Sequence, residues 1–136
     1  TLRLTRRQRQ MCIRDRCLLA LDGKLDEASV AWDPRAALGV VVAAGGYPDS
    51  YEKGKPIAGL GSTDESAVKI FHAGTAEKNG RIVTSGGRVL CVVGMGDSVT
   101  AAREIAYKHA RRIEWEGAFF RSDIGYRAVR RELAPK

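Results

Sequence analysis

The stretch LCVVGMGDSVTAA, residues 90–102, joins an apolar run, two glycines and the start of a helix, and the fold depends on how it is interpreted. A strand, a glycine turn and a helix in this order are typical of a dinucleotide-binding loop. That fingerprint needs a third glycine, but Val99 stands in its place. Glu116 follows at about the distance of a ribose-binding acid, yet no second strand lies beneath the helix. We therefore expect no dinucleotide here, and interpret Gly94 and Gly96 as permitting a tight strand-to-helix turn.

The residues after these glycines predict one long helix. Apolar side chains recur every three or four positions, which places them on one face. Asp97 or Ser98 can cap the first turn, and Gly117 is expected to end the helix. The apolar face consists of Val99, Ala102, Ile105 or Ala106, Ala110 and Ile113.

Short apolar runs elsewhere predict strands. The valine-rich run 36–44 is expected to be a buried strand, with a shorter strand at 31–33 before it. Residues 48–60 have the proline, glycine and charge content of a surface loop, and a short helix is expected near 61–66.

A hairpin is the clearest local prediction. KIFHAGT, residues 69–75, alternates like a strand, and Asn79-Gly80 between TAEK and RIVTS is a strong signal for a two-residue hairpin turn. The apolar run after Gly86-Gly87 predicts a further buried strand. The sequence thus predicts an α+β fold, with a mainly antiparallel sheet and one long helix packed on it.

The basic residues are concentrated at the start of the chain. The net charge is +7, from 23 Lys and Arg against 16 Asp and Glu. Residues 1–16 hold six arginines and one aspartate, which leaves 17 basic and 15 acidic residues in 17–136, a balance of +2. MCIRDR, residues 11–16, resembles a translated sequencing adapter, so we expect 1–16 to be a non-native leader. The alternatives are a solvated arginine-rich helix end and an RNA-binding arm, although the segment has no aromatic residue for base stacking.

Other patterns point to no self-contained active site. Cys12, Cys17 and Cys91 fit no zinc motif, and Cys91 is expected to be a small buried hydrophobe rather than a catalytic thiol. His72 is expected to be a hydrogen-bonded structural residue. No Walker loop, apolar span or signal peptide is present, so we expect a cytoplasmic protein without membrane or nucleic-acid partners.

Several segments together resemble one family. They are LDGKLDEASVAWDPRAALGVVVAAGGYPDSYEKGKPIAGL (21–60), KIFHAGT (69–75), TSGGRVLCVVGMGDSV (84–99) and IEWEGAFFRSDIGYRAV (113–129). Their order and spacing are similar to those of the C-terminal domain of glycinamide ribonucleotide synthetase, also called phosphoribosylamine–glycine ligase. The resemblance covers residues 17–136 and implies an ATP-grasp C-terminal domain of the rudimentary hybrid motif type.

The resemblance also implies a reaction in purine (IMP) biosynthesis. In that family ATP phosphorylates glycine, and the amine of 5-phosphoribosylamine attacks the acyl phosphate to give glycinamide ribonucleotide, ADP and phosphate. Magnesium or manganese assists through phosphate oxygens. The family's ATP-clamping lobes, its N-terminal substrate-binding domain and its acidic metal-ligand segment have no counterpart here. We therefore expect a fragment that is inactive alone and binds neither ATP nor a metal, its parent meeting the small-molecule substrates through the missing domains.

By analogy with related ATP-grasp enzymes, this domain closes the active site and offers basic groups to the ribose phosphate. Arg88 is the candidate, since a guanidinium can clamp phosphate oxygens bidentately. Gly86 and Gly87 would let the backbone approach the anion and donate N–H groups. The alternative is a plain strand-linking turn with a surface arginine. Ser85 stands where the family pattern often has asparagine.

A second candidate is the cleft-lining group Gly45, Gly46, Tyr47 and Pro48, which can equally be a bend at a strand end. Arg121, Asp123 and Arg127 are expected to form a structural ion-pair network rather than to contact substrate. The alternative for the whole chain is a non-catalytic stand-alone binding module. The reading frame upstream of Cys17 separates the two hypotheses, because a fragment's frame would continue into ATP-grasp sequence.

Overall fold

The computed structural model describes residues 6–29, 32–61 and 66–134, with side chains described from residue 14 onward. Contacts divide the chain into two units, residues 1–33 and 34–136. In the first unit, helix α1 (Arg6–Leu21) ends shortly before Gly23, which adopts a φ of 68°, and the 3-10 turn η1 (Leu25–Glu27) follows. The helix crosses residue 16 without a break, and a non-native leader stays a prediction.

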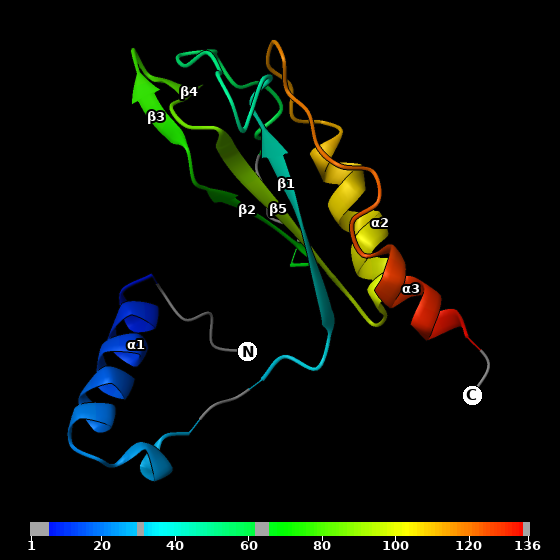
Figure 1. The fold of residues 1–136 in the computed structure, drawn as a ribbon. Coiled ribbons are helices and arrows are strands. Elements are labelled where there is room, and N and C mark those ends of the chain that lie inside the picture. Colours follow the sequence, from blue (N-terminus) through cyan, green and yellow to red (C-terminus); the bar gives the residue numbers. More distant parts are fainter. Residues whose placement is uncertain (1–5, 30–31, 62–65, 135–136) are drawn as a thin grey trace. The chain divides into compact units, whose positions relative to one another are not determined.

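The second unit is built on antiparallel strands, which confirms the predicted fold class. Strand β5 (Arg88–Gly96) lies between β1 (Ala36–Ala43) and β2 (Val68–His72), and α2 (Val99–Ala110) packs against this sheet (Figure 1). Strands β3 (Thr75–Lys78) and β4 (Arg81–Thr84) form a separate hairpin, and α3 (Tyr126–Leu133) follows α2 in the chain.

One predicted element is not found in the structure, and another lies mostly outside the described residues. Trp32 and Asp33 lack strand structure, so the prediction of a strand at 31–33 is wrong for these two residues, and Ala31 lies outside the described residues. Regular pairing begins only at Ala36, opposite Gly96. The short helix expected near 61–66 lies mostly outside the described residues, and Ser66 is in a turn.

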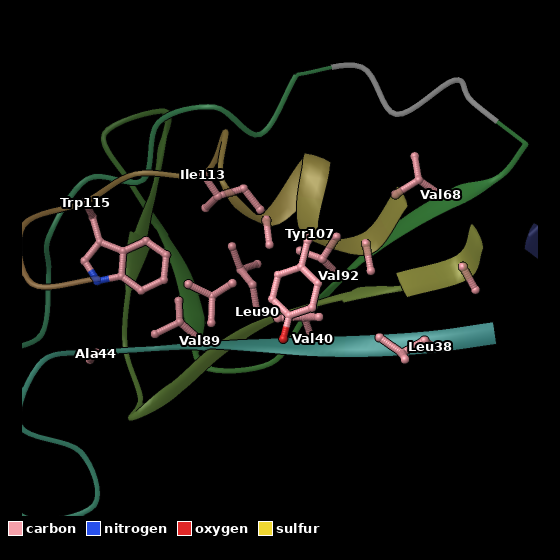
Figure 2. Close-up of a cluster of buried hydrophobic side chains, with 14 residues drawn as sticks. Leu38, Val40, Ala44, Val68, Val89, Leu90, Val92, Tyr107, Ile113 and Trp115 are labelled. Atoms are coloured by element: carbon pink, nitrogen blue, oxygen red, sulfur yellow. The ribbon is translucent and has the colours of Figure 1, made fainter. Parts of the chain in front are cut away.

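The core lies between the sheet and α2. Alternate residues of β1 are buried, as expected for a strand with one covered face. Val40, Val42, Leu90 and Val92 are fully or almost fully buried, and Tyr107 of α2 lies against them (Figure 2). The other face of the sheet is more open, with Val41 at 42% and Phe71 at 51% exposure.

Gly94 and Gly96 act differently from the turn residues that the sequence predicts. Both lie within β5, and neither has the left-handed φ that turn glycines need. A Cβ on Gly94 would overlap the carbonyl oxygen of Ala102 and lie 2.6 Å from the amide nitrogen of Ala106. These glycines therefore let the backbone of α2 approach the strand closely.

Both ends of α2 are defined by named contacts. Ser98 is the N-cap, its side chain accepting from the Ala101 N–H at 3.0 Å. The Glu132 carboxylate of α3 accepts from the N–H groups of Val99 and Thr100, at 2.9 and 3.0 Å. The helix ends at Ala110 rather than near Gly117, because the following residues pair with another segment, Glu114 forming a bridge with Ala58.

The predicted hairpin is confirmed, and a loop completes it. Asn79 and Gly80 have φ values of 52° and 70° in the two-residue turn. On the free side of β4, the loop 54–57 pairs like a short strand: Thr84 donates to the Lys55 carbonyl at 2.9 Å and Ile57 to the Ile82 carbonyl at 2.9 Å. The Lys55 ammonium forms ion pairs with Glu52 and Glu116, which raise its pKa.

Candidate anion-binding site

Arg88 is the first residue of β5 and follows Gly86-Gly87 directly. Two glycines, Gly74 and Gly86, bring the backbone together here. The Gly74 N–H donates to the Arg88 carbonyl at 2.9 Å, and the Gly86 N–H donates to the Gly74 carbonyl at 3.1 Å. A Cβ on Gly74 would lie 2.7 Å from both the Arg88 oxygen and the Gly86 Cα. The crossing fixes the backbone beneath the exposed Arg88 side chain.

This crossing corrects part of the sequence interpretation. The N–H of Gly86 is already used by Gly74, so it is not a free donor for an anion. Gly87 is then the glycine of the pair whose N–H is the candidate donor. A Cβ on Gly87 would lie 2.8 Å from Tyr47 Cε2 and 3.0 Å from Tyr51 Cε1, so glycine is needed under these two rings.

The second predicted group, residues 45–48, forms the turn after β1. The Tyr47 N–H donates to the Ala44 carbonyl at 3.1 Å. Gly46 has a φ of 91°, and a Cβ on Gly45 would lie 2.9 Å from the Gly117 oxygen, so both glycines serve backbone geometry. Pro48 follows Tyr47 through a cis peptide bond. Of the four residues, Tyr47 reaches the candidate site.

A hollow of about 490 Å³ is lined by members of both predicted groups. Arg88 and Gly87 form one part of its wall and Tyr47 another. Its lining residues are Val41, Tyr47, Tyr51, Ala73, Gly87, Arg88, Leu90 and Cys91. The guanidinium, a glycine backbone and two phenol groups provide hydrogen-bond donors suited to an anion.

An adjoining hollow of about 260 Å³ is mainly apolar. It shares Val41, Tyr47 and Arg88 with the first. Its other lining residues are Gly39, Ala43, Phe119, Phe120, Arg121 and Ile124.

Cys91 is the thiol in the lining of the first hollow. Burial raises the pKa of the Cys91 thiol, which keeps it protonated and weakens it as a nucleophile. Cys91 is partly rather than fully buried, because it lines the first hollow. Neither lining set includes a carboxylate or a histidine among the described residues. No three His, Cys, Asp or Glu side chains of residues 14–29, 32–61 and 66–134 are grouped for a metal ion.

The other residues considered from the sequence have structural contacts. Arg121 and Asp123 form a bidentate pair, with N···O distances of 2.8 and 2.6 Å. Arg127 donates instead to the Tyr126 hydroxyl at 3.0 Å, so it does not join that pair. His72 hydrogen-bonds Thr75, with Nδ1 and Oγ1 3.1 Å apart, as its structural interpretation predicts.

Tyr51, Phe119 and Phe120 are lining residues that the sequence interpretation missed. Tyr51 comes from a loop that carries no local signal of a site, and both phenylalanines follow the helix by several residues. Phe119 reaches the site because its backbone pairs with Ala43. Its side chain is 43% exposed.

Among the described residues, no helix is both long enough and apolar enough to cross a lipid bilayer.

The fold is an α+β domain with two adjoining hollows and an arginine at the start of its central strand. Residues 37–127 match the family model described as "Phosphoribosylglycinamide synthetase, C domain". The chain belongs to this family, as its sequence resemblance implies.

Relatives named phosphoribosylamine–glycine ligase agree with this membership. The protein from Vibrio vulnificus is 55% identical over 116 residues, which are 85% of this chain and 27% of that protein. The one from Haemophilus influenzae is 56% identical over 117 residues, 86% of this chain and 27% of the relative. The crystal structure of the Thermotoga maritima ligase is similar with a TM-score of 0.61 and 44% identity, over 76% of this chain and 26% of that one. The chain thus spans about 27% of the length of the curated relatives it matches.

Proposed function

We propose that this chain is the C-terminal part of an ATP-dependent phosphoribosylamine–glycine ligase of purine biosynthesis, acting in the cytosol on small-molecule substrates. Within it, Arg88 and the Gly87 N–H bind the phosphate of the phosphoribosyl group. The observation that carries the proposal is the convergence of Arg88, Gly87 and Tyr47 on one hollow in a chain of this family. A charged donor beside a backbone N–H suits phosphate oxygens.

The phosphate is the part of the substrate that this site is suited to hold. Phosphate carries the substrate's negative charge, and Arg88 offers a planar set of donors at an exposed position. The crossing of Gly74 with Gly86 and Arg88 holds the backbone in place before a ligand arrives, which reduces the entropy cost of binding. The chain's role is therefore to position the substrate, while the bond-forming step belongs to other parts of the ligase.

ATP and magnesium or manganese would bind elsewhere in the proposed ligase. The described residues offer no group of three acidic, His or Cys side chains, so the donor set here does not fit a divalent cation. No step of the reaction is therefore assigned to a metal held by this chain. The site that binds ATP would lie in the parts of the relatives that this chain does not span.

A chimeric enzyme tests the role of Arg88. Residues 17–136 replace the matching segment of the intact Vibrio vulnificus relative, and Arg88→Ala is then introduced. Losing a charge-assisted contact of about 1.5–3 kcal/mol raises the KM for phosphoribosylamine about ten-fold or more. We expect little change in kcat or in the KM for ATP and glycine, because ground-state binding of one substrate is lost.

Arg81→Ala is the matched control, since Arg81 is an exposed arginine of the β3–β4 hairpin outside both hollows. It should leave all three KM values unchanged. An unchanged KM for phosphoribosylamine in Arg88→Ala removes Arg88 from the site. Equal effects of both substitutions would indicate a general charge effect rather than a bound phosphate.

A further inference from the structure

The two hollows meet along shared residues, and this continuity carries an inference beyond the phosphate. Val41, Tyr47 and Arg88 line both of them. A ligand whose anionic group lies at Arg88 therefore has a second space next to that group. This second space holds about 260 Å³.

The lining of the second hollow suits a planar, weakly polar group. Tyr47 and Phe119 are aromatic lining residues, and Ile124 and Val41 add aliphatic surface. Phe120 also lines the hollow, although its ring packs against Tyr107. Stacking on aromatic side chains is a common and sequence-tolerant way to bind nucleobases. A ribose phosphate without a base has nothing comparable to place there.

One wall of this hollow is fixed by side chains of α2. The Tyr107 hydroxyl donates to the Arg121 carbonyl at 2.6 Å and accepts from the Ile124 N–H at 3.0 Å. Arg103 donates to the carbonyls of Ile124 and Ser122, each at 3.0 Å. The wall is thus preorganised, which lowers the cost of ordering it around a ligand.

We infer that this site binds nucleoside monophosphates, with the phosphate at Arg88 and the base in the hollow lined by Tyr47, Phe119 and Phe120. The inference rests on the proposed function, because both use the same phosphate contact. A purine nucleotide would compete with the phosphoribosyl substrate for Arg88. The reaction would then be sensitive to nucleotide concentration through this part of the chain.

Binding of three probes to the 136-residue chain, measured by calorimetry, tests the inference. The probes are AMP, ribose 5-phosphate and adenosine. We expect AMP to bind about ten-fold more tightly than ribose 5-phosphate, because only AMP adds a base for stacking. Adenosine, which lacks the phosphate, should bind more weakly than AMP.

Phe119→Ala should weaken AMP binding about ten-fold and change ribose 5-phosphate binding less than two-fold. The backbone pairing of Phe119 with Ala43, at 2.8 and 3.0 Å, does not need the ring, and far-UV circular dichroism checks that the fold is kept. If the alanine variant unfolds, the same affinities are measured with Phe119→Leu, which keeps apolar bulk. Phe71→Ala is the matched control, an exposed phenylalanine outside both hollows that should leave every affinity unchanged.

The outcomes separate the two proposals. If AMP and ribose 5-phosphate bind equally and both depend on Arg88, the base subsite is wrong and the phosphate site stands. If AMP binds more tightly but Phe119 variants leave its affinity unchanged, the base lies elsewhere and the inference is again overturned. If Arg88→Ala changes neither affinity, the phosphate site fails as well.

Discussion

Gly94→Ala tests the close approach of the backbones of β5 and α2. The added Cβ would lie 2.6 Å from the Ala106 nitrogen and would overlap the Ala102 oxygen, both backbone atoms that no rotamer change can move. To bring the Ala106 contact alone to 3.0 Å, the helix must retreat by about 0.4 Å, and the Ala102 overlap requires about twice that. Because Ala102 and Ala106 are fully buried, the retreat opens gaps along the interface.

The magnitude follows from these gaps. Separations of about 0.5–1 Å forfeit a quarter to a half of each dispersion contact. Overpacking substitutions cost about 1–3 kcal/mol, and a clash with helix backbone belongs at the upper end. We expect Gly94→Ala to lower the free energy of unfolding by about 3 kcal/mol, equivalent to a fall in Tm of about 10–20 °C for a domain of this size.

Urea and thermal unfolding, followed by far-UV circular dichroism, measure this loss. Gly61→Ala is the matched control, since a Cβ there meets no atom within 4 Å and its φ is not left-handed. It should be neutral or stabilise by up to about 1 kcal/mol, through the unfolded state. If Gly94→Ala costs less than about 0.5 kcal/mol, the helix does not pack on this strand as described.

Two further substitutions test contacts that hold the C-terminal segments. Glu132→Gln should lower the urea midpoint at pH 7, because hydrogen bonds from Thr100 and from the Val99 N–H hold the pKa of Glu132 below its usual value. This stabilisation is present above the ordinary pKa of a glutamate, about 4.3, and is lost as pH falls through the lowered value, so a gap of equal size at pH 7 and pH 2 would contradict it. Tyr107→Phe leaves the Arg121 carbonyl and the Ile124 N–H without their partner, which should cost about 1–2 kcal/mol in thermal unfolding and speed amide exchange at Ile124. Unchanged exchange there would show that another group holds the segment.

The sequence predicts elements best where local chemistry decides them. Asn79-Gly80 alone specifies the hairpin, because both residues tolerate a positive φ. The end of α2 was predicted wrongly because Ile113 continues the helical spacing. Ile113 is indeed buried, but in a segment that pairs with the loop near Ala58, and that pairing joins residues far apart in the chain.

The sequence predicts only some of the residues of the candidate site. Arg88 and Tyr47 were predicted as members of two separate groups, and the fold places both on one hollow. Phe119 could not be predicted, since the bridge to Ala43 that brings it there is a tertiary contact. The glycine spacing draws attention to a turn at Gly94, whereas the role of Gly94 depends on its contact with the backbone of α2, which no motif encodes.

The strand-like loop beside β4 bears on self-association. Lys55 and Ile57 direct their hydrogen bonds toward β4, so the intervening Pro56 directs its backbone outward. Proline has no N–H, and an outward edge that lacks this donor is a poor template for a strand from another molecule. Pro56 therefore removes no hydrogen bond to β4, and it discourages edge-to-edge aggregation of the domain.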